Sequence, residues 1–133
     1  MNRVASRLLS ASRVALVPPI VMILAACTQP ESADSLLVPE ALRGQWNTDV
    51  GACGTGRNDS ALRIGADSIW FYESRGPLTD IAHRGDAEFT ATAHLSGEGE
   101  VWSTPIHFAL SRDGNKLKDL RPGLGRFSRH RCP

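Results

Sequence analysis

The chain has 133 residues, which leaves room for one compact domain with a single core and excludes two. Its formal net charge of +1 conceals an asymmetry, because three of the 15 basic residues and none of the 14 acidic residues lie within residues 1–26. The remaining chain therefore has a net charge near −2. Within it, acidic residues predominate through residue 111, and basic residues predominate from residue 112 to residue 133.

The first 26 residues have the composition of a targeting segment. Arg3, Arg7 and Arg13 give a positive start, and an apolar run over residues 14–26 follows. That run has 13 residues, too few for a helix that spans about 30 Å of hydrocarbon. We interpret residues 1–26 as a signal peptide whose removal leaves Cys27 to be modified. The alternatives are an ordinary signal peptide that happens to be cleaved before a cysteine, and a buried apolar helix.

The end of this run carries a short motif, Leu24-Ala25-Ala26-Cys27. It resembles the lipobox of bacterial lipoproteins, which consists of Leu, two small residues and a Cys. The resemblance implies that Cys27 becomes the first residue and bears a diacylglycerol, with palmitate or similar acyl chains. Thr28 is not the Asp that often marks retention in the inner membrane, so we expect the outer membrane, facing the periplasm. Several acyl chains together anchor a protein stably.

A flexible linker follows the lipidated cysteine over residues 27–38, which are mostly polar and Pro-containing. We expect the single folded domain to cover residues 39–133. It begins with one helical turn over residues 39–43, which Gly44 ends. Beyond this turn, the apolar residues show no convincing helical period.

Alternation of apolar and polar residues instead predicts a series of β-hairpins. If Glu98 and Gly99 form a two-residue loop, every large apolar residue of the two flanking strands lies on one face. The predicted partners on that face are Leu95 with Trp102, Ala93 with Thr104, Ala91 with Ile106, and Phe89 with Phe108. The other face is mostly polar.

Two further turns predict hairpins in the same way. A turn at Ala66-Asp67 pairs Ile64 with Ile69 and Leu62 with Phe71. Asp113-Gly114 is a type I′ turn signal that sets Leu110 opposite Leu117. With strands over residues 45–48, 77–84 and 125–131, the prediction is an all-β antiparallel meander of seven or eight strands. We favour a closed barrel over a two-sheet sandwich.

Two cysteines remain once Cys27 carries lipid. In an oxidising periplasm, Cys53 and Cys132 are most simply a disulfide, with two free thiols or a metal pair as the alternatives. A thiolate zinc site would need further cysteines that the chain lacks. The bond would join the first strand to the last, which favours the barrel.

Two segments of the domain resemble known groups of proteins. Gly44-Gln45-Trp46 resembles the Gly-x-Trp pattern on the first strand of lipocalins, where the Trp closes one end of a barrel; we expect Trp46 to be a core residue. Residues 71–76, Phe-Tyr-Glu-Ser-Arg-Gly, resemble a segment of small uncharacterised envelope proteins of Gram-negative bacteria, which implies no activity.

Trp70 and Tyr72 are candidate binding residues. If Phe71 faces the core, its two aromatic neighbours face outward and form a contact patch. The alternative is that a loop or the N-terminal turn covers them.

The C-terminal stretch is a second candidate surface. Arg126, Arg129 and Arg131, with Arg121 and His130, could meet lipopolysaccharide phosphates, anionic lipid or an acidic partner. The alternative is a solvated edge strand whose arginines balance the acidic body of the domain.

The chain contains no sequence motif that predicts catalysis, a cofactor or a metal. The histidines at positions 83, 94, 107 and 130 are not expected to converge, and Glu98 and Glu100 lie at a solvated hairpin tip. The glycine-rich residues 51–56 lack the Lys-Ser/Thr and the strand-to-helix context of a phosphate loop.

These features favour a monomeric, non-enzymatic binding module of the cell envelope, with no nucleic-acid partner. Its partner is an envelope macromolecule or a small ligand. One alternative is a periplasmic inhibitor of a protease or lysozyme, because such inhibitors are also small, disulfide-linked β-barrels. The other is a lipocalin-like carrier, which would need an internal cavity.

Overall fold

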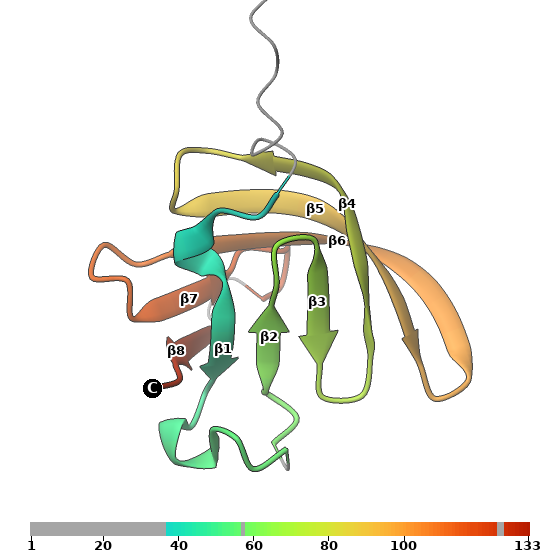
Figure 1. Ribbon diagram of the computed structural model, residues 1–133, viewed down its shortest axis with the longest axis horizontal. Helices are drawn as coiled ribbons and strands as arrows, with labels where there is room; N and C mark the ends of the chain where they lie inside the picture. Colours follow the sequence, from blue (N-terminus) through green and yellow to red (C-terminus); the bar gives the residue numbers. More distant parts are fainter. Residues whose placement is uncertain (1–36, 57, 125–126) are drawn as a thin grey trace, which may run out of the picture.

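A computed structural model describes residues 37–56, 58–124 and 127–133. Within these ranges, eight antiparallel strands follow one another around a closed barrel (Figure 1). The strands are β1 (Gly44–Asn47), β2 (Leu62–Ile64), β3 (Ser68–Phe71), β4 (Arg75–His83), β5 (Glu88–Gly97), β6 (Glu100–Leu110), β7 (Lys116–Asp119) and β8 (Ser128–Arg131). Two 3-10 helices, η2 (Glu40–Leu42) and η3 (Val50–Ala52), flank β1.

The predicted barrel is confirmed, because the first strand closes the sheet against the last. β1 pairs with β2 on one side and with β8 on the other, where Trp46 lies opposite Arg131. Cys53 and Cys132 form the predicted disulfide, with Cα atoms 5.8 Å apart. The bond ties the loop after β1 to the residue that follows β8.

The predicted pairing of β5 with β6 is confirmed at every position. Phe89 lies opposite Phe108, and the register continues without interruption to Gly97 opposite Glu100. Glu98 and Gly99, the two loop residues, have φ angles of 50° and 83°, as a type I′ turn requires at its central positions.

The other two predicted hairpins also have the expected partners. Leu62 pairs with Phe71, and Leu110 pairs with Leu117. The predicted type I′ turn at Asp113-Gly114 is wrong, because Gly114 has a positive φ of 74° and Asp113 does not. Instead, the Asp113 carboxylate accepts hydrogen bonds from the hydroxyl of Ser111 and the backbone N–H of Asn115, which stabilises a longer loop.

Inward-facing side chains fill the barrel. Trp46, Phe89, Ile106 and Phe108 are at most 1% exposed, and each such side chain contributes roughly 1.5 to 3 kcal/mol by burial. The core also contains Val38, which the sequence had assigned to the linker: it is 0% exposed, and its N–H donates to the carbonyl of Ala66. The packed chain therefore starts before Pro39.

Helix η2 is the predicted helical turn, and it closes one end of the barrel. Leu42 is fully buried, and its carbonyl accepts a hydrogen bond of 3.1 Å from the indole Nε1 of Trp46. Trp46 is thus a core residue, as expected from its place after Gly44. In Figure 1, η2 lies at the start of β1.

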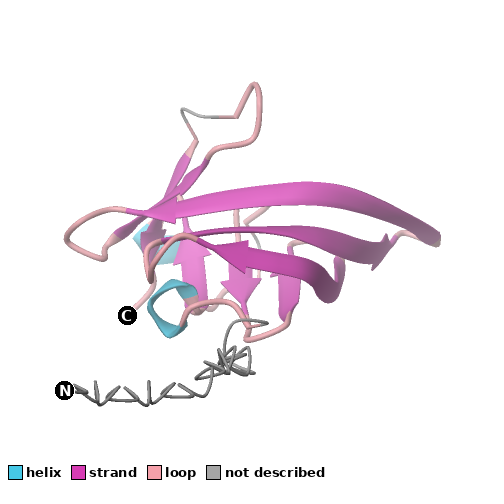
Figure 2. Cartoon of the chain, turned by 90° about the horizontal axis from the view of Figure 1, so that it is seen from above, coloured by secondary structure: helices cyan, strands magenta, loops and turns pink. Residues whose placement is uncertain are grey.

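Strands β5 and β6 are the longest, and they project beyond the other strands (Figures 1 and 2). For this reason Trp102, on the inward face opposite the buried Leu95, is still 39% exposed. In the described part of the chain, no helix is long and apolar enough to span a membrane.

Candidate functional site

Trp70 and Tyr72 lie on the outward face of β3 and of the turn that follows it. Ile69 is fully buried and Phe71 packs against the core, so alternation directs the residues between and after them outward. The guanidinium of Arg63 lies 5.1 Å from the centre of the Trp70 ring, which is half-buried. Tyr72 is 46% exposed. The two side chains form one aromatic ridge, the Trp70–Tyr72 ridge.

A groove lies on one side of this ridge, between the β3–β4 turn and the β5–β6 hairpin. Its volume is about 730 Å³. Besides the ridge, its wall includes Glu73, Glu100 and Val101, and Val101 is 81% exposed. We call this hollow the hairpin groove.

Backbone approach determines the shape of the hairpin groove. A Cβ atom at Gly97 would lie 2.2 Å from the carbonyl oxygen of Glu73, and one at Gly76 would lie 1.7 Å from the carbonyl oxygen of His94. Only glycine allows β4 and its turn to approach the hairpin this closely. A side chain at either glycine would therefore force β4 or its turn away from the hairpin.

A smaller hollow of about 320 Å³ lies on the other side of the ridge. Its wall includes Trp70 and Tyr72 again, Gln45 and Arg63 on neighbouring strands, and the disulfide. The loop between β1 and β2 forms its rim. The Trp70–Tyr72 ridge is thus shared by two hollows, which is the arrangement of a contact surface with pockets for more than one side chain.

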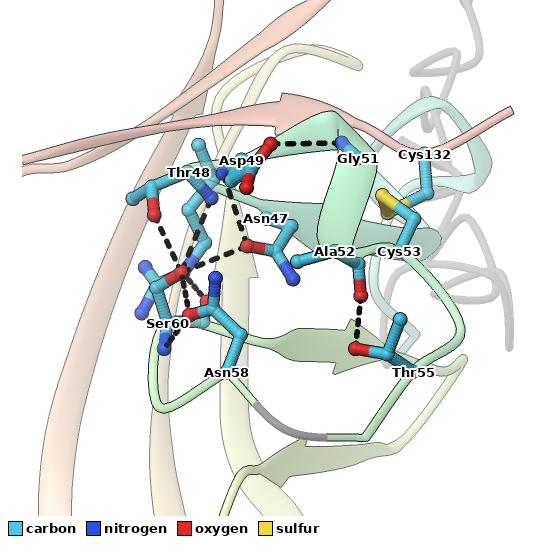
Figure 3. The surroundings of a disulfide bond; sticks show 11 residues. Asn47, Thr48, Asp49, Gly51, Ala52, Cys53, Thr55, Asn58, Ser60 and Cys132 are labelled. Atoms are coloured by element: carbon cyan, nitrogen blue, oxygen red, sulfur yellow. Dashed lines mark hydrogen bonds between the residues drawn. A yellow bond between two sulfur atoms is a disulfide. The ribbon is translucent and has the colours of Figure 1, made fainter.

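A polar network holds the β1–β2 loop in place (Figure 3). The Ser60 hydroxyl lies 2.9 and 2.6 Å from the side-chain oxygens of Asn47 and Asn58, which share its single hydrogen. It also lies 2.6 Å from the Thr48 hydroxyl. Ser60 and Asn47 are both buried, at 7% and 2% exposure. Together with the disulfide, this network fixes one rim of the smaller hollow.

The prediction that Arg129 belongs to a basic C-terminal surface is wrong. Arg129 faces the barrel interior and is 6% exposed; its Nε donates to the carbonyl oxygen of Ser60 at 2.7 Å. Burial lowers the pKa of Arg129 to about 10, with nearby Asp119 acting in the opposite direction. Arg126, also predicted there, lies outside the described residues.

Arg131 also has a structural position. It is half-buried with its guanidinium 4.2 Å from the centre of the Trp46 ring, and it donates hydrogen bonds to the carbonyl oxygens of Ala41, Arg43 and Gly114. Three of the five N–H groups of this guanidinium are thus donated to backbone carbonyls. The edge-strand alternative is wrong as well, because β8 pairs on both sides.

The histidines do not converge on a single site. The ring of His94 bridges the hydroxyls of Thr79 and Ser103, each at 2.8 Å, whereas His107 contacts Glu88 at 2.7 Å. The hydrogen bond from His107 lowers the pKa of the Glu88 carboxyl. Among the described residues, no cluster of three or more His, Cys, Asp or Glu side chains could hold a metal ion.

Sequence reasoning did not anticipate that Glu100 and Val101 belong to the site. The available signal was strand length, since β6 is far longer than β7 and must extend past it. Comparison with protein-family models, curated proteins and solved structures finds no match to this chain.

Proposed function

We propose that this protein is a non-enzymatic binding module of the bacterial cell envelope, anchored by lipid on Cys27. The observation that carries the binding role is the outward-facing Trp70–Tyr72 ridge with a hollow on each side. Aromatic side chains beside pockets supply a large contact area at a low cost in side-chain entropy. The barrel below is a rigid support, since its interior is packed and a disulfide closes it.

The filled interior favours binding at the surface over carriage of an enclosed ligand. A lipocalin-like carrier needs a cavity inside the barrel, whereas here Trp46, Phe89 and Phe108 occupy that space. The two hollows beside the ridge open outward. The partner therefore meets the outer face of β3 and the β5–β6 hairpin.

The double variant Trp70→Ala/Tyr72→Ala tests the ridge. We expect it to lose at least about tenfold in affinity for the partner, because truncated aromatic anchors typically cost 2 kcal/mol or more. We expect its unfolding free energy to fall by only about 1 to 2 kcal/mol, since Tyr72 is 46% exposed and Trp70 is half-buried. The measurements are quantitative crosslinking in envelope extract and urea denaturation.

Leu124→Ala is the matched control, because Leu124 is 40% exposed and lies in the loop between β7 and β8. It should leave the crosslinked partners unchanged. A double variant that captures the same partners as the unchanged protein would contradict the binding role. If the partner is a protease or lysozyme, the unchanged protein should slow that hydrolase and the double variant should not.

The lipid anchor is tested by Cys27→Ser. A serine oxygen does not replace the thiol that accepts diacylglycerol, so the variant should carry no acyl chains. Because the acyl chains hold the protein in the membrane, we expect at least about 90% of the variant to leave the membrane fraction. Fractionation of cells and intact mass measure this outcome. Thr28→Ser is the control and should stay in the membrane. A Cys27→Ser protein that remains membrane-bound would refute the anchor.

A further inference from the structure

We propose that the outer edge of β6 binds an extended, basic polypeptide segment by β-strand addition. This inference rests on the proposed binding function and names the class of partner. The observation behind it is an unpaired stretch of backbone on the projecting hairpin. The edge begins with Glu100 and Val101, which also line the hairpin groove.

The unpaired stretch follows from unequal strand lengths. β7 pairs with β6 only at Phe108, Ala109 and Leu110, and the chain then leaves the sheet after one more bond, from the Leu120 N–H to the His107 carbonyl. Residues 100–106 of β6 thus have β5 on one side and no strand on the other. The projection of this hairpin is visible in Figure 2.

The direction of the backbone groups shows which residues are available. Leu110 donates its N–H toward the β5 side, to Ala87, whereas the carbonyl of His107 accepts from Leu120 on the β7 side. Because these directions alternate along an antiparallel strand, odd-numbered residues direct their N–H and C=O groups to the outer edge. Val101 and Ser103 therefore present free backbone groups, and among the described residues no backbone hydrogen bond satisfies them.

Pro105 argues against a second copy of this chain as the occupant. Two β6 edges paired antiparallel about Ser103 would set each Val101 opposite the Pro105 of the other copy. Proline has no N–H, so such a pair would lose one hydrogen bond at each end. A proline at an edge commonly prevents pairing between identical strands. A peptide of another sequence can still pair with Val101 and Ser103.

Charge selects a basic partner. Glu98 and Glu100 lie at the tip of the hairpin, and Glu73 lies across the hairpin groove. Arg75 is the basic residue that lines the same groove. A segment that lies along the edge passes this acidic tip, so lysine or arginine side chains near one of its ends would be attracted. The exposed Val101 side chain offers an apolar contact beside the pairing groups.

The experiment uses the full chain in detergent and a display library of random peptides about twelve residues long. We expect enriched peptides to alternate β-branched residues with others and to carry Lys or Arg. Ser103→Pro removes the outward N–H and leaves the ladder to β5 intact, as the native Pro105 does. It should lower the affinity of the enriched peptides about tenfold. Its urea midpoint should match that of Ser103→Ala, because both variants lose the hydroxyl that lies 2.8 Å from His94. Ser103→Ala keeps the N–H and should bind normally.

Each other outcome overturns the proposal. A library without binders, binders without basic residues, or equal binding by Ser103→Pro would exclude strand addition of a basic segment. Peptides lost by Trp70→Ala/Tyr72→Ala and kept by Ser103→Pro would support the ridge and refute the edge. A wild-type dimer in sedimentation that Ser103→Pro dissociates would identify a second copy as the occupant.

Discussion

Replacing both Cys53 and Cys132 by alanine should lower the free energy of unfolding by about 4 kcal/mol. The bond links residues 79 positions apart, so it restricts almost the whole unfolded domain. The chain-entropy model gives roughly 4 to 5 kcal/mol for such a loop, and residual structure reduces the effect. Because small domains have only about 5 to 15 kcal/mol of stability, this loss removes a large share of the total.

Urea denaturation of the protein with and without a reductant measures the effect. Reduction of the unchanged protein should give the same loss as the double variant, and reductant should not affect the double variant. Cys53→Ala alone should match the double variant in stability. A loss below about 1 kcal/mol would show that the paired strands and packed core close this barrel without the bond.

Hairpin register was predictable because a two-residue loop and a period of two residues leave few choices. At Glu98-Gly99, one register alone brings Phe89 opposite Phe108 and Leu95 opposite Trp102, and a slip by one residue would move every large side chain to the wrong face. The strand order then followed from consecutive hairpins. These rules are local, so they required no knowledge of the rest of the chain.

Irregular features were not predictable by the same rules. β4 contains a break in register between Thr79 and Ala82, and Asp80 there has a positive φ of 52°. No turn signal in the sequence marks this bulge. At Asp113-Gly114 the dipeptide predicted a two-residue turn, but hydrogen bonds from Ser111 and Asn115 to the Asp113 side chain stabilise a longer loop.

The candidate site was half predictable. Alternation about Phe71 placed Trp70 and Tyr72 outward. Arg129 was wrongly placed on the surface, because a charged side chain normally indicates exposure to solvent. Inside this barrel, Arg129 donates a hydrogen bond to the carbonyl oxygen of Ser60, which lies 69 positions away in the sequence. No sequence pattern predicts that pairing. Contacts of that range depend on the closed sheet and cannot be read from neighbouring residues.

Arg131→Ala should lower the free energy of unfolding by about 3 kcal/mol, although the residue is only half-buried. Its guanidinium lies over the Trp46 ring and donates hydrogen bonds to three backbone carbonyl oxygens. Two of these belong to η2 and the residue after it, and one belongs to the β6–β7 loop. Each hydrogen bond to a charged group contributes about 1.5 to 3 kcal/mol when buried and less near solvent. Arg131→Lys keeps the charge but cannot reach three acceptors, so it should lose about 2 kcal/mol.

Arg63→Ala is the matched control, because Arg63 also lies over a tryptophan, Trp70, but is exposed. It should cost less than about 1 kcal/mol, the usual value of an exposed cation–π contact. Hydrogen exchange distinguishes closure of the barrel end from general stability: in Arg131→Ala, the amides of Leu42 and Arg43 should exchange faster than those of β5. Equal losses for Arg131→Ala and Arg63→Ala would mean that Trp46 and η2 close this end of the barrel without the Arg131 side chain.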